Sequence, residues 1–245
     1  MSTSDLPPLT ANAALRWDAL QRLLPARLGD VLEIGCGQGS VTARLAPRAD
    51  SLLALEPDAQ SFAVASRRLR GMAEVRNSSA DALPDDATFD TVCAFEVLEH
   101  IEDDAAALAT WVRQIRPGGR LLLSVPAHAD RMGLCDRLVG HFRRYDRADL
   151  EGLLARRGLH VRHLALYGGP GGYALEAARE AIARAKMRAA SGQDIAERTA
   201  GSGRFLQPAS GWQARAVQLA SLPAIFAQRL LPGTGPGLIA IAERR

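Results

Sequence analysis

The sequence predicts an α/β protein in which helices cover both faces of a doubly wound, mostly parallel β-sheet. Three observations favour this fold. Short apolar segments typical of strands alternate with helical patterns from residue 31 to residue 167, and the connections between them are short. Such alternation is typical of βαβ units. At 245 residues the chain can bury one good core but hardly two, so we expect a single domain over residues 1–245.

The expected elements follow one another in a regular order. Thr10 can cap a first helix that ends near Pro25, which gives an N-terminal helical cap over residues 1–28. The Pro117-Gly118-Gly119 sequence is expected to stop a later helix and turn the chain. We expect strands at 31–34, 52–55, 74–76, 91–95, 120–125, 161–167 and 238–241, and helices at about 41–47, 62–69, 103–115 and 150–157.

The segment 168–232 breaks this rhythm. It contains a glycine cluster, helical patterns near 173–190 and 212–231, and a polar stretch rich in glycine and serine between them. We interpret it as a helical insertion that forms a lid. It separates the main core over residues 29–167 from a final strand within 233–245.

Composition excludes several classes of protein. The net charge is +3, but Lys186 is the only lysine and no basic run is interleaved with aromatic residues, so no nucleic-acid partner is expected. The three cysteines are widely spaced and form neither a zinc motif nor a disulfide framework. No signal peptide and no apolar run of about 18 residues is visible. We therefore expect a cytoplasmic protein without a transmembrane segment.

The segment Val31–Ser40, with the sequence VLEIGCGQGS, is the strongest functional signal. In a doubly wound sheet, ligands bind beyond the carboxyl ends of the strands, and glycines let a ligand approach the backbone. A tight turn of purely structural origin is the alternative. Glu33 favours a ligand, because an acid in an apolar strand needs a partner and a cationic amino group is a natural one. Glu56 ends the next strand, where a carboxylate can accept hydrogen bonds from ribose hydroxyls.

A nicotinamide-dependent dehydrogenase would use the same part of the fold. Its G-x-G-x-x-G pattern requires glycine where this chain has Ser40, and a strand that binds pyrophosphate has little use for Glu33. The dehydrogenase is therefore disfavoured.

Five segments, taken in their order along the chain, resemble the class I S-adenosylmethionine-dependent methyltransferases. They are VLEIGCGQGS, LLALEPD, ADALPDDATFDTV, FEVLEHIED and IRPGGRLLLSVP. The resemblance covers about residues 25 to 167 and implies a Rossmann-like, seven-stranded sheet whose last strand is antiparallel. It is closest to the small-molecule enzymes. DNA methyltransferases typically carry Asp/Asn-Pro-Pro-Tyr where this chain has Ala94-Phe95-Glu96, and no Pro-Cys nucleophile is present.

The resemblance also implies which residues bind the donor, S-adenosylmethionine, whose product is S-adenosylhomocysteine. Glu33 and the glycines would line its methionine part, Glu56 would hold the ribose, and residues 79–81 would meet the adenine. Many relatives carry aspartate at the position of Ser79. The full set of expected cofactor-binding residues is Glu33, Gly35, Cys36, Gly37, Glu56, Pro57, Ser79, Ala80, Asp81, Phe95 and Glu96.

The sequence Glu96-Val97-Leu98-Glu99-His100 resembles the end of the fourth strand in the quinone-biosynthesis O-methyltransferases, where comparable acids and histidine can bind a divalent cation. The same string is common among relatives that are not known to need a metal. A divalent metal is thus possible but not expected, and we assign no metal ligands.

The acceptor is less well indicated. The sequence GHFRRYD over 140–146 is expected to form a substrate-facing loop, with a solvated loop in which Asp146 caps the next helix as the alternative. A similar segment occurs in methyltransferases of lipid and glycan pathways, so a lipid-linked or glycan-related small molecule is one option. For O-methylation, His141 and His100 are the candidate general bases, followed by Tyr145.

Two other functions stay open. The same fold can use S-adenosylmethionine for cyclisation or decarboxylation, or the chain can be a cofactor-binding partner protein without catalysis. Monomer and homodimer are both compatible with the sequence.

Overall fold

The computed structural model describes residues 6–189 and 212–245. These residues form a seven-stranded sheet in the order β3-β2-β1-β4-β5-β7-β6. β7 is antiparallel to both β5 and β6, and the other paired strands are parallel. This confirms the predicted fold. The strands are β1 (Gly29–Ile34), β2 (Ala49–Leu55), β3 (Glu74–Arg76), β4 (Phe89–Phe95), β5 (Ile115–Pro126), β6 (Leu159–Tyr167) and β7 (Gly237–Arg244).

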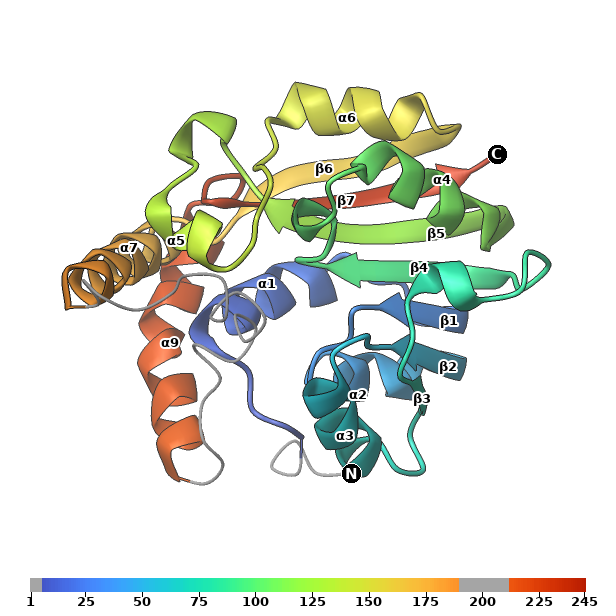
Figure 1. Ribbon diagram of the computed structural model, residues 1–245, viewed down its shortest axis with the longest axis horizontal. Helices are drawn as coiled ribbons and strands as arrows, with labels where there is room; N and C mark the ends of the chain where they lie inside the picture. Colours follow the sequence, from blue (N-terminus) through green and yellow to red (C-terminus); the bar gives the residue numbers. More distant parts are fainter. Residues whose placement is uncertain (1–5, 190–211) are drawn as a thin grey trace.

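Helices cover the sheet on both faces, and Figure 1 shows α4 and α6 on one side with α1, α2 and α3 on the other. Residues that alternate along one strand serve two cores. On β4, Val92 belongs to the core under α4 and α6, whereas Cys93 belongs to the core under the other helices. The described helices are α1 (Ala11–Gln21), α2 (Thr42–Leu45), α3 (Ala59–Arg68), α4 (Asp104–Arg113), α5 (Leu134–Leu138), α6 (Arg147–Ala155), α7 (Gly171–Ala189) and α9 (Trp212–Leu230).

Local signals explain several helix ends. The Thr10 hydroxyl accepts a hydrogen bond from the Ala13 amide at 3.2 Å, as expected for the cap of α1. The side chains of Asp58 and Asp103 cap α3 and α4 in the same way. The short helix α5 was not predicted, because its five residues are too few to show a helical period.

The expectation for the Pro117-Gly118-Gly119 sequence was wrong. α4 ends at Arg113, and the three residues lie inside β5 instead of in a turn before it. Ile115 pairs with Phe89 and Arg120 pairs with Thr91, so the ladder is interrupted between them. The left-handed φ of +78° at Gly118 accommodates this bulge.

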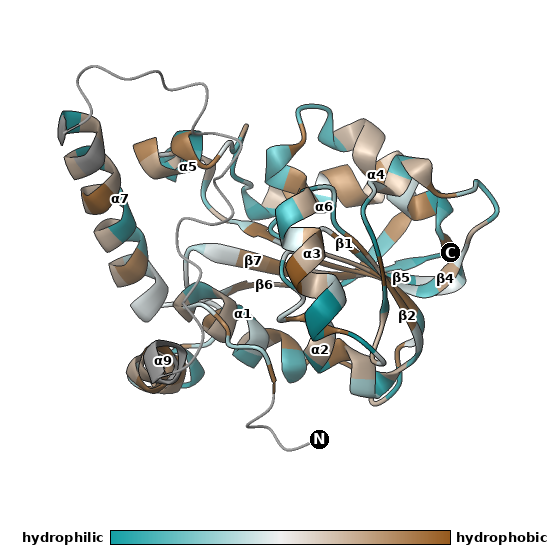
Figure 2. Ribbon diagram, turned by 60° about the horizontal axis from the view of Figure 1, so that its bottom comes forward, coloured by the Kyte–Doolittle hydropathy of each residue, from teal (hydrophilic) through white to brown (hydrophobic). Residues whose placement is uncertain are grey.

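The helices of the predicted insertion lie beyond the carboxyl ends of the parallel strands. Figure 1 shows α5, α7 and α9 gathered there, and Figure 2 shows α7 extending away from the sheet. α9 packs against α1, where the buried Asp18 accepts hydrogen bonds from Gln228 and Arg229. The N-terminal cap and the insertion are therefore joined. The predicted polar stretch between α7 and α9 lies outside the described residues.

Among residues 6–189 and 212–245, no helix has the length and apolar character needed to cross a membrane.

Candidate cofactor and acceptor site

The glycine turn after β1 contains three glycines in the left-handed region, at φ +70°, +56° and +80° for Gly35, Gly37 and Gly39. Their surroundings differ. A Cβ on Gly35 would lie 2.6 Å from a methyl group of Val97, and one on Gly39 would lie 2.7 Å from a methyl group of Leu69. Apart from Gly37 itself and its two neighbours in the chain, no atom of the described residues lies within 4 Å of the Cβ position of Gly37. Gly37 is thus the point where a ligand can approach the backbone.

Glu56 at the end of β2 is fixed toward this turn. Its carboxylate accepts hydrogen bonds from the amide of Gly37 at 2.7 Å and from the amide of Asp58 at 2.8 Å. The side chain of Asn77 donates to the Glu56 carbonyl at 2.8 Å and to the Pro57 carbonyl at 3.0 Å, which holds the loop after β2. Burial raises the pKa of Glu56, although the two amides oppose this shift. The carboxylate keeps acceptor positions for hydroxyl groups of a ligand.

Glu33 lies on β1 between Ala54 and Cys93 and is only 2% exposed. Its Oε2 atom is buried without a hydrogen-bond partner in the described part of the chain. Burial raises the pKa of Glu33 to about 7, against the opposite influence of Thr42 and Arg16. A buried carboxyl group of this kind is costly unless a ligand supplies its partner.

The third acid of the site, Glu96, was predicted, but its partner Arg16 was missed by sequence reasoning. Glu96 follows β4 with a left-handed φ of +57°, and its carboxylate accepts hydrogen bonds from Ser124 at 2.9 Å and Tyr167 at 3.3 Å. The guanidinium of Arg16 on α1 lies 3.6 Å from the same oxygen. Burial alone would lower the pKa of Arg16, but Tyr167 and Glu96 outweigh it and raise the pKa. Nothing in the α1 sequence marks Arg16, because only the packing of α1 under the sheet brings it here.

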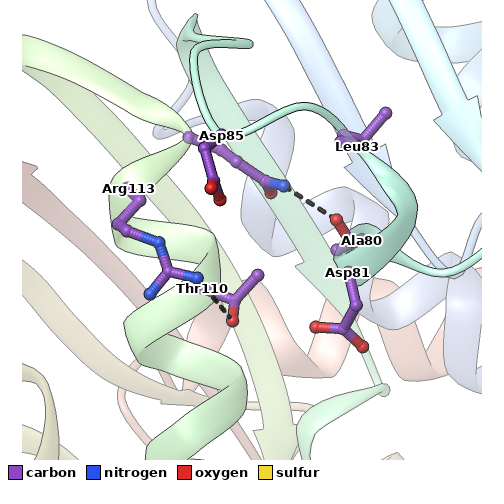
Figure 3. Close-up of a pocket in the computed structure, with 7 residues that line it drawn as sticks. Ala80, Asp81, Leu83, Asp85, Thr110 and Arg113 are labelled. Atoms are coloured by element: carbon purple, nitrogen blue, oxygen red, sulfur yellow. Dashed lines mark hydrogen bonds between the residues drawn. The ribbon is translucent and has the colours of Figure 1, made fainter.

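The residues expected at the adenine occupy a different environment. Ser79 precedes a short 3-10 helix over Ala80–Ala82, and the Ala80 carbonyl accepts a hydrogen bond from Gln114 at 2.9 Å. Figure 3 shows Ala80 and Asp81 facing Arg113 across a cavity of about 100 Å³ between this turn and α4. None of the residues lining that cavity comes from the glycine turn or from Glu56.

Two further predicted cofactor residues, Cys36 and Phe95, are buried. Cys36 is buried, its thiol lies 3.6 Å from the Gly37 carbonyl, and burial raises its pKa, so the thiol is not activated. Phe95 is 7% exposed and packs in the core on the α1 side of the sheet.

Glu99, His100 and His141 form a second cluster at this end of the sheet. The two imidazole rings are nearly perpendicular, with centroids 4.6 Å apart. His141 Nε2 lies 3.9 Å from a Glu99 oxygen, and His141 Nδ1 lies 3.1 Å from Asp136. Burial, reinforced by Glu96, raises the pKa of the Glu99 carboxyl well above its usual value. The structure thus brings together two histidines that are far apart in the sequence.

A buried ion-pair network supports the loop that carries His141. Arg144 donates two hydrogen bonds to the Asp136 carboxylate, at 2.9 and 3.0 Å, and one to Glu176 of α7 at 3.1 Å. Burial would raise the pKa of Asp136, but the hydrogen bonds from His141, the Gly133 amide and Arg144 lower it to about 2. The side chain of Arg144 is only 7% exposed, so this loop is not the solvated loop of the alternative interpretation.

Tyr145 is placed unfavourably for the role of general base. It is 4% exposed in the core under α4 and α6, and its hydroxyl donates to Asp104 at 2.9 Å. Burial and this bond raise its pKa. The suggested side-chain cap by Asp146 is also absent from the described structure: Asp146 immediately precedes α6, but its carboxylate accepts a hydrogen bond from the Ala129 amide at 3.2 Å.

His128 was not predicted as a site residue. It follows β5 with a left-handed φ of +65°. Its Nε2 atom lies 3.1 Å from the Gly235 carbonyl and 3.2 Å from the hydroxyl of Tyr173 on α7. A non-glycine residue in this conformation is uncommon and often marks a functional region. Its only sequence signal was its position just beyond a strand.

The sheet order, the turn at Gly37 and the acid at Glu56 together define the class I methyltransferase fold. Residues 10–164 match a family model described as "Methyltransferase domain". Since this match covers more than half of the chain, the chain belongs to the methyltransferase domain family.

Similar proteins fit this assignment. The chain is 33% identical over 135 residues to a probable S-adenosylmethionine-dependent methyltransferase of Mycolicibacterium smegmatis, covering 54% of this chain and 52% of the relative. It is 30% identical over 127 residues to the ubiquinone biosynthesis O-methyltransferase of Paracidovorax citrulli, covering 49% and 53%. The chain thus spans about half the length of these curated relatives.

Solved structures show the fold over nearly the whole chain. A putative methyltransferase from Bacillus halodurans superposes with a TM-score of 0.62 at 15% identity, covering 94% of this chain and 98% of that one. The [4+2]-cyclase SpnF superposes with a TM-score of 0.60 at 21% identity, covering 95% and 81%.

Proposed function

We propose that the chain binds S-adenosylmethionine at the glycine turn and transfers its methyl group to a small-molecule acceptor, with a hydroxyl oxygen as the preferred target. The observation that carries the proposal is the buried carboxyl of Glu33, one oxygen of which has no partner among the described residues. It lies on the strand that leads into the open backbone at Gly37, whose amide is bonded to Glu56. An amino group and a ribose diol on one ligand match these two acids.

The relatives support the type of reaction. Their names include an S-adenosylmethionine-dependent methyltransferase, a ubiquinone biosynthesis O-methyltransferase and the trans-aconitate 2-methyltransferase of Deinococcus radiodurans. The last two names refer to methyl transfer to small molecules, and one of them specifies oxygen.

The chemistry requires alignment above all. The acceptor oxygen attacks the methyl carbon, the carbon–sulfur bond breaks, and its electron pair stays on sulfur as S-adenosylhomocysteine forms. The protein must hold the two reactants in line and exclude water. The hydroxyl proton needs an acceptor, and His141 and His100 stay the predicted candidates. Tyr145 is the weakest candidate because its hydroxyl already donates to Asp104.

The segment 168–232 is proposed to form the wall of the acceptor site. α7 reaches the end of β5 through Tyr173, which bonds His128, and reaches the His141 loop through Glu176. The residues near the acceptor side would then include the network of Arg144 and Asp136. A lipid-linked or glycan-related acceptor is compatible with this arrangement. Methyl transfer to a water-soluble analogue of a lipid-linked acceptor, compared with transfer to a water-soluble analogue of a glycan, distinguishes these two acceptor classes.

Calorimetry with S-adenosylhomocysteine tests the donor site. Glu56→Ala should weaken binding at least tenfold, because hydrogen bonds to a charged group contribute about 1.5–3 kcal/mol each. Glu74→Ala is the matched control, since Glu74 is an exposed acid on the neighbouring strand β3 and should leave binding unchanged. Absence of binding by the wild-type chain would refute the proposal.

Incubation with S-adenosylmethionine and a panel of hydroxyl-containing acceptors tests the reaction. S-adenosylhomocysteine should appear only when a suitable acceptor is present. Cofactor binding combined with cofactor-dependent conversion of an acceptor, but without S-adenosylhomocysteine, would favour the non-methylating alternative. Binding without any conversion across the panel would favour a non-catalytic partner protein.

A further inference from the structure

We propose that the outward face of α9 docks on an anionic lipid surface, an interaction that does not depend on the proposed methyl transfer. Large apolar residues lie exposed on successive turns of this helix. They are Leu219, Leu222, Phe226 and Leu230, and each is between 55% and 66% exposed. Spacings of three and four residues place them on one side of a helix, so they form a continuous stripe, here called the α9 stripe.

The inward face of α9 carries buried polar residues. Ser221 and Gln228 are only 5% and 3% exposed, and their spacing of seven residues places both on the side opposite the stripe. The Gln228 side chain donates to the Leu15 carbonyl at 3.1 Å and accepts from the Gly168 amide at 2.7 Å. Rotation of α9 to bury the stripe would break these buried hydrogen bonds. The fold therefore holds the apolar stripe outward.

Exposed apolar residues are concentrated in this part of the molecule. Apart from Phe142, every large apolar residue that is exposed in the described structure lies in α7, in α9 or at Leu231. The methyltransferase family model ends at residue 164, so both helices lie outside the part of the chain that it matches. Single exposed apolar side chains are ordinary, whereas a contiguous stripe usually marks an interaction surface. The stripe is therefore a feature of the appended helices and not of the cofactor-binding core.

The charges around the stripe are positive. The sequence of α9 contains two arginines and no acidic residue, and residues 181–189 of α7 contain three cationic residues and no acidic one. Near the end of α9, the guanidiniums of Arg22 and Arg229 share the single carboxylate of Asp18, which leaves an excess positive charge. These two arginine side chains are still 45% and 53% exposed. An apolar stripe flanked by cations fits the boundary between anionic lipid headgroups and acyl chains.

The same charges disfavour a second copy of the chain as the occupant. Pairing of two α9 stripes would bring arginines of both copies to one interface, with no acidic residue on either helix to compensate. Figures 1 and 2 show α9 at the edge of the molecule, where an extended surface can reach it. A bilayer accepts arginine side chains at the level of the headgroups while apolar side chains enter the acyl boundary. Charge and position therefore favour a lipid surface.

Flotation of the full chain with vesicles tests this inference, with no cofactor or acceptor present. Wild-type chain should bind vesicles made of phosphatidylglycerol and phosphatidylcholine in equal parts, and it should bind more weakly to phosphatidylcholine alone or at high salt. Leu222→Ser and Phe226→Ser should each weaken binding about tenfold or more, because each removes a large apolar side chain from the boundary. Phe142→Ser is the matched control and should bind like wild type, since it removes an aromatic residue that is 52% exposed on the loop between α5 and α6.

Thermal unfolding of the variants and analytical ultracentrifugation of the wild type complete the test. Leu222→Ser and Phe226→Ser should unfold at the wild-type temperature, because the side chains that they remove are exposed. Wild-type chain that binds neither kind of vesicle, or binds both equally well, would overturn the inference. Folded stripe variants that bind as tightly as Phe142→Ser would also overturn it. A wild-type dimer that Phe226→Ser dissociates, without vesicle binding, would assign the stripe to a second copy of the chain instead.

Discussion

The proposed donor side and the proposed acceptor side of this site are built in different ways. On the donor side, Glu33, Gly37 and Glu56 lie within 24 consecutive residues and are placed by two adjacent parallel strands. On the proposed acceptor side, Glu99, His141 and Glu176 come from three segments that are distant in the sequence and meet only in the folded chain. The first arrangement follows from local geometry, and the second depends on the packing of loops and helices. The ligand of the donor site can therefore be predicted from the sequence, whereas that of the acceptor site cannot.

The largest expected effect concerns Glu33 in the cofactor-free chain. The pKa of Glu33 is raised to about 7 in the folded protein from 4.5. Ionisation of this carboxyl therefore lowers the free energy of unfolding as pH rises from about 4.5 to 7, whereas the protonated form at lower pH carries no such penalty. Glu33→Gln should be more stable than wild type by about 3 kcal/mol at pH 8, with little difference at pH 4. Urea unfolding at both pH values measures this, with Glu74→Gln as control. A difference that does not depend on pH would show that burial of the charge is not the cause.

The next test separates the two roles of glycine in the turn. Gly39→Ala combines a left-handed conformation with a methyl group 2.7 Å from Leu69 and should cost about 2–3 kcal/mol of stability. Gly37→Ala meets no described atom and should cost about 1 kcal/mol, yet it should weaken cofactor binding more. Thermal unfolding and calorimetry with S-adenosylhomocysteine compare the pair. Equal loss of stability in Gly37→Ala and Gly39→Ala would contradict the view that Gly39 is needed for packing and Gly37 for access of the ligand.

Asp136 provides the corresponding test on the proposed acceptor side. The pKa of Asp136 is lowered to about 2 from 3.8. Its contribution to the free energy of unfolding is therefore present above about pH 4 and is lost as pH falls toward 2. At pH 7, Asp136→Asn should be less stable by about 2 kcal/mol. The difference in free energy of unfolding between wild type and Asp136→Asn, measured by urea unfolding, should become smaller below pH 4. Asp130→Asn, in the preceding 3-10 turn, is the control. An Asp136→Asn variant that is as stable as wild type at pH 7 would show that the ion-pair network around Asp136 does not stabilise the fold.

Tyr145→Phe should have the smallest effect. Asp104 keeps its ion pair with Arg143 at 2.7 Å after the hydroxyl is removed, so the loss of stability is about 1 kcal/mol or less. Turnover with a responsive acceptor should stay within about twofold of wild type. If turnover instead fell by about two orders of magnitude or more while cofactor affinity stayed unchanged, Tyr145 would be restored as a general base.

Sequence patterns were sufficient for the elements with strong local periodicity. The positions of the strands along the chain, the cap at Thr10 and the glycine turn were predicted because each depends on neighbouring residues. The bulge in β5 was missed because a Pro-Gly-Gly sequence has the same local signal in a turn as in a distorted strand. The short helix α5 was missed because it contains little more than one helical turn.

The donor half of the site follows from the sequence alone: an apolar strand with one acid, a glycine turn, and a second acid at the end of the next strand. The spacing of these residues is set by strand geometry, so no distant contact is needed to place them. Tertiary packing, in contrast, determines that Arg16 lies against Glu96, that Tyr145 is buried, and that His141 meets Glu99. These contacts join segments dozens of residues apart, and their positions depend on packing that no local pattern records.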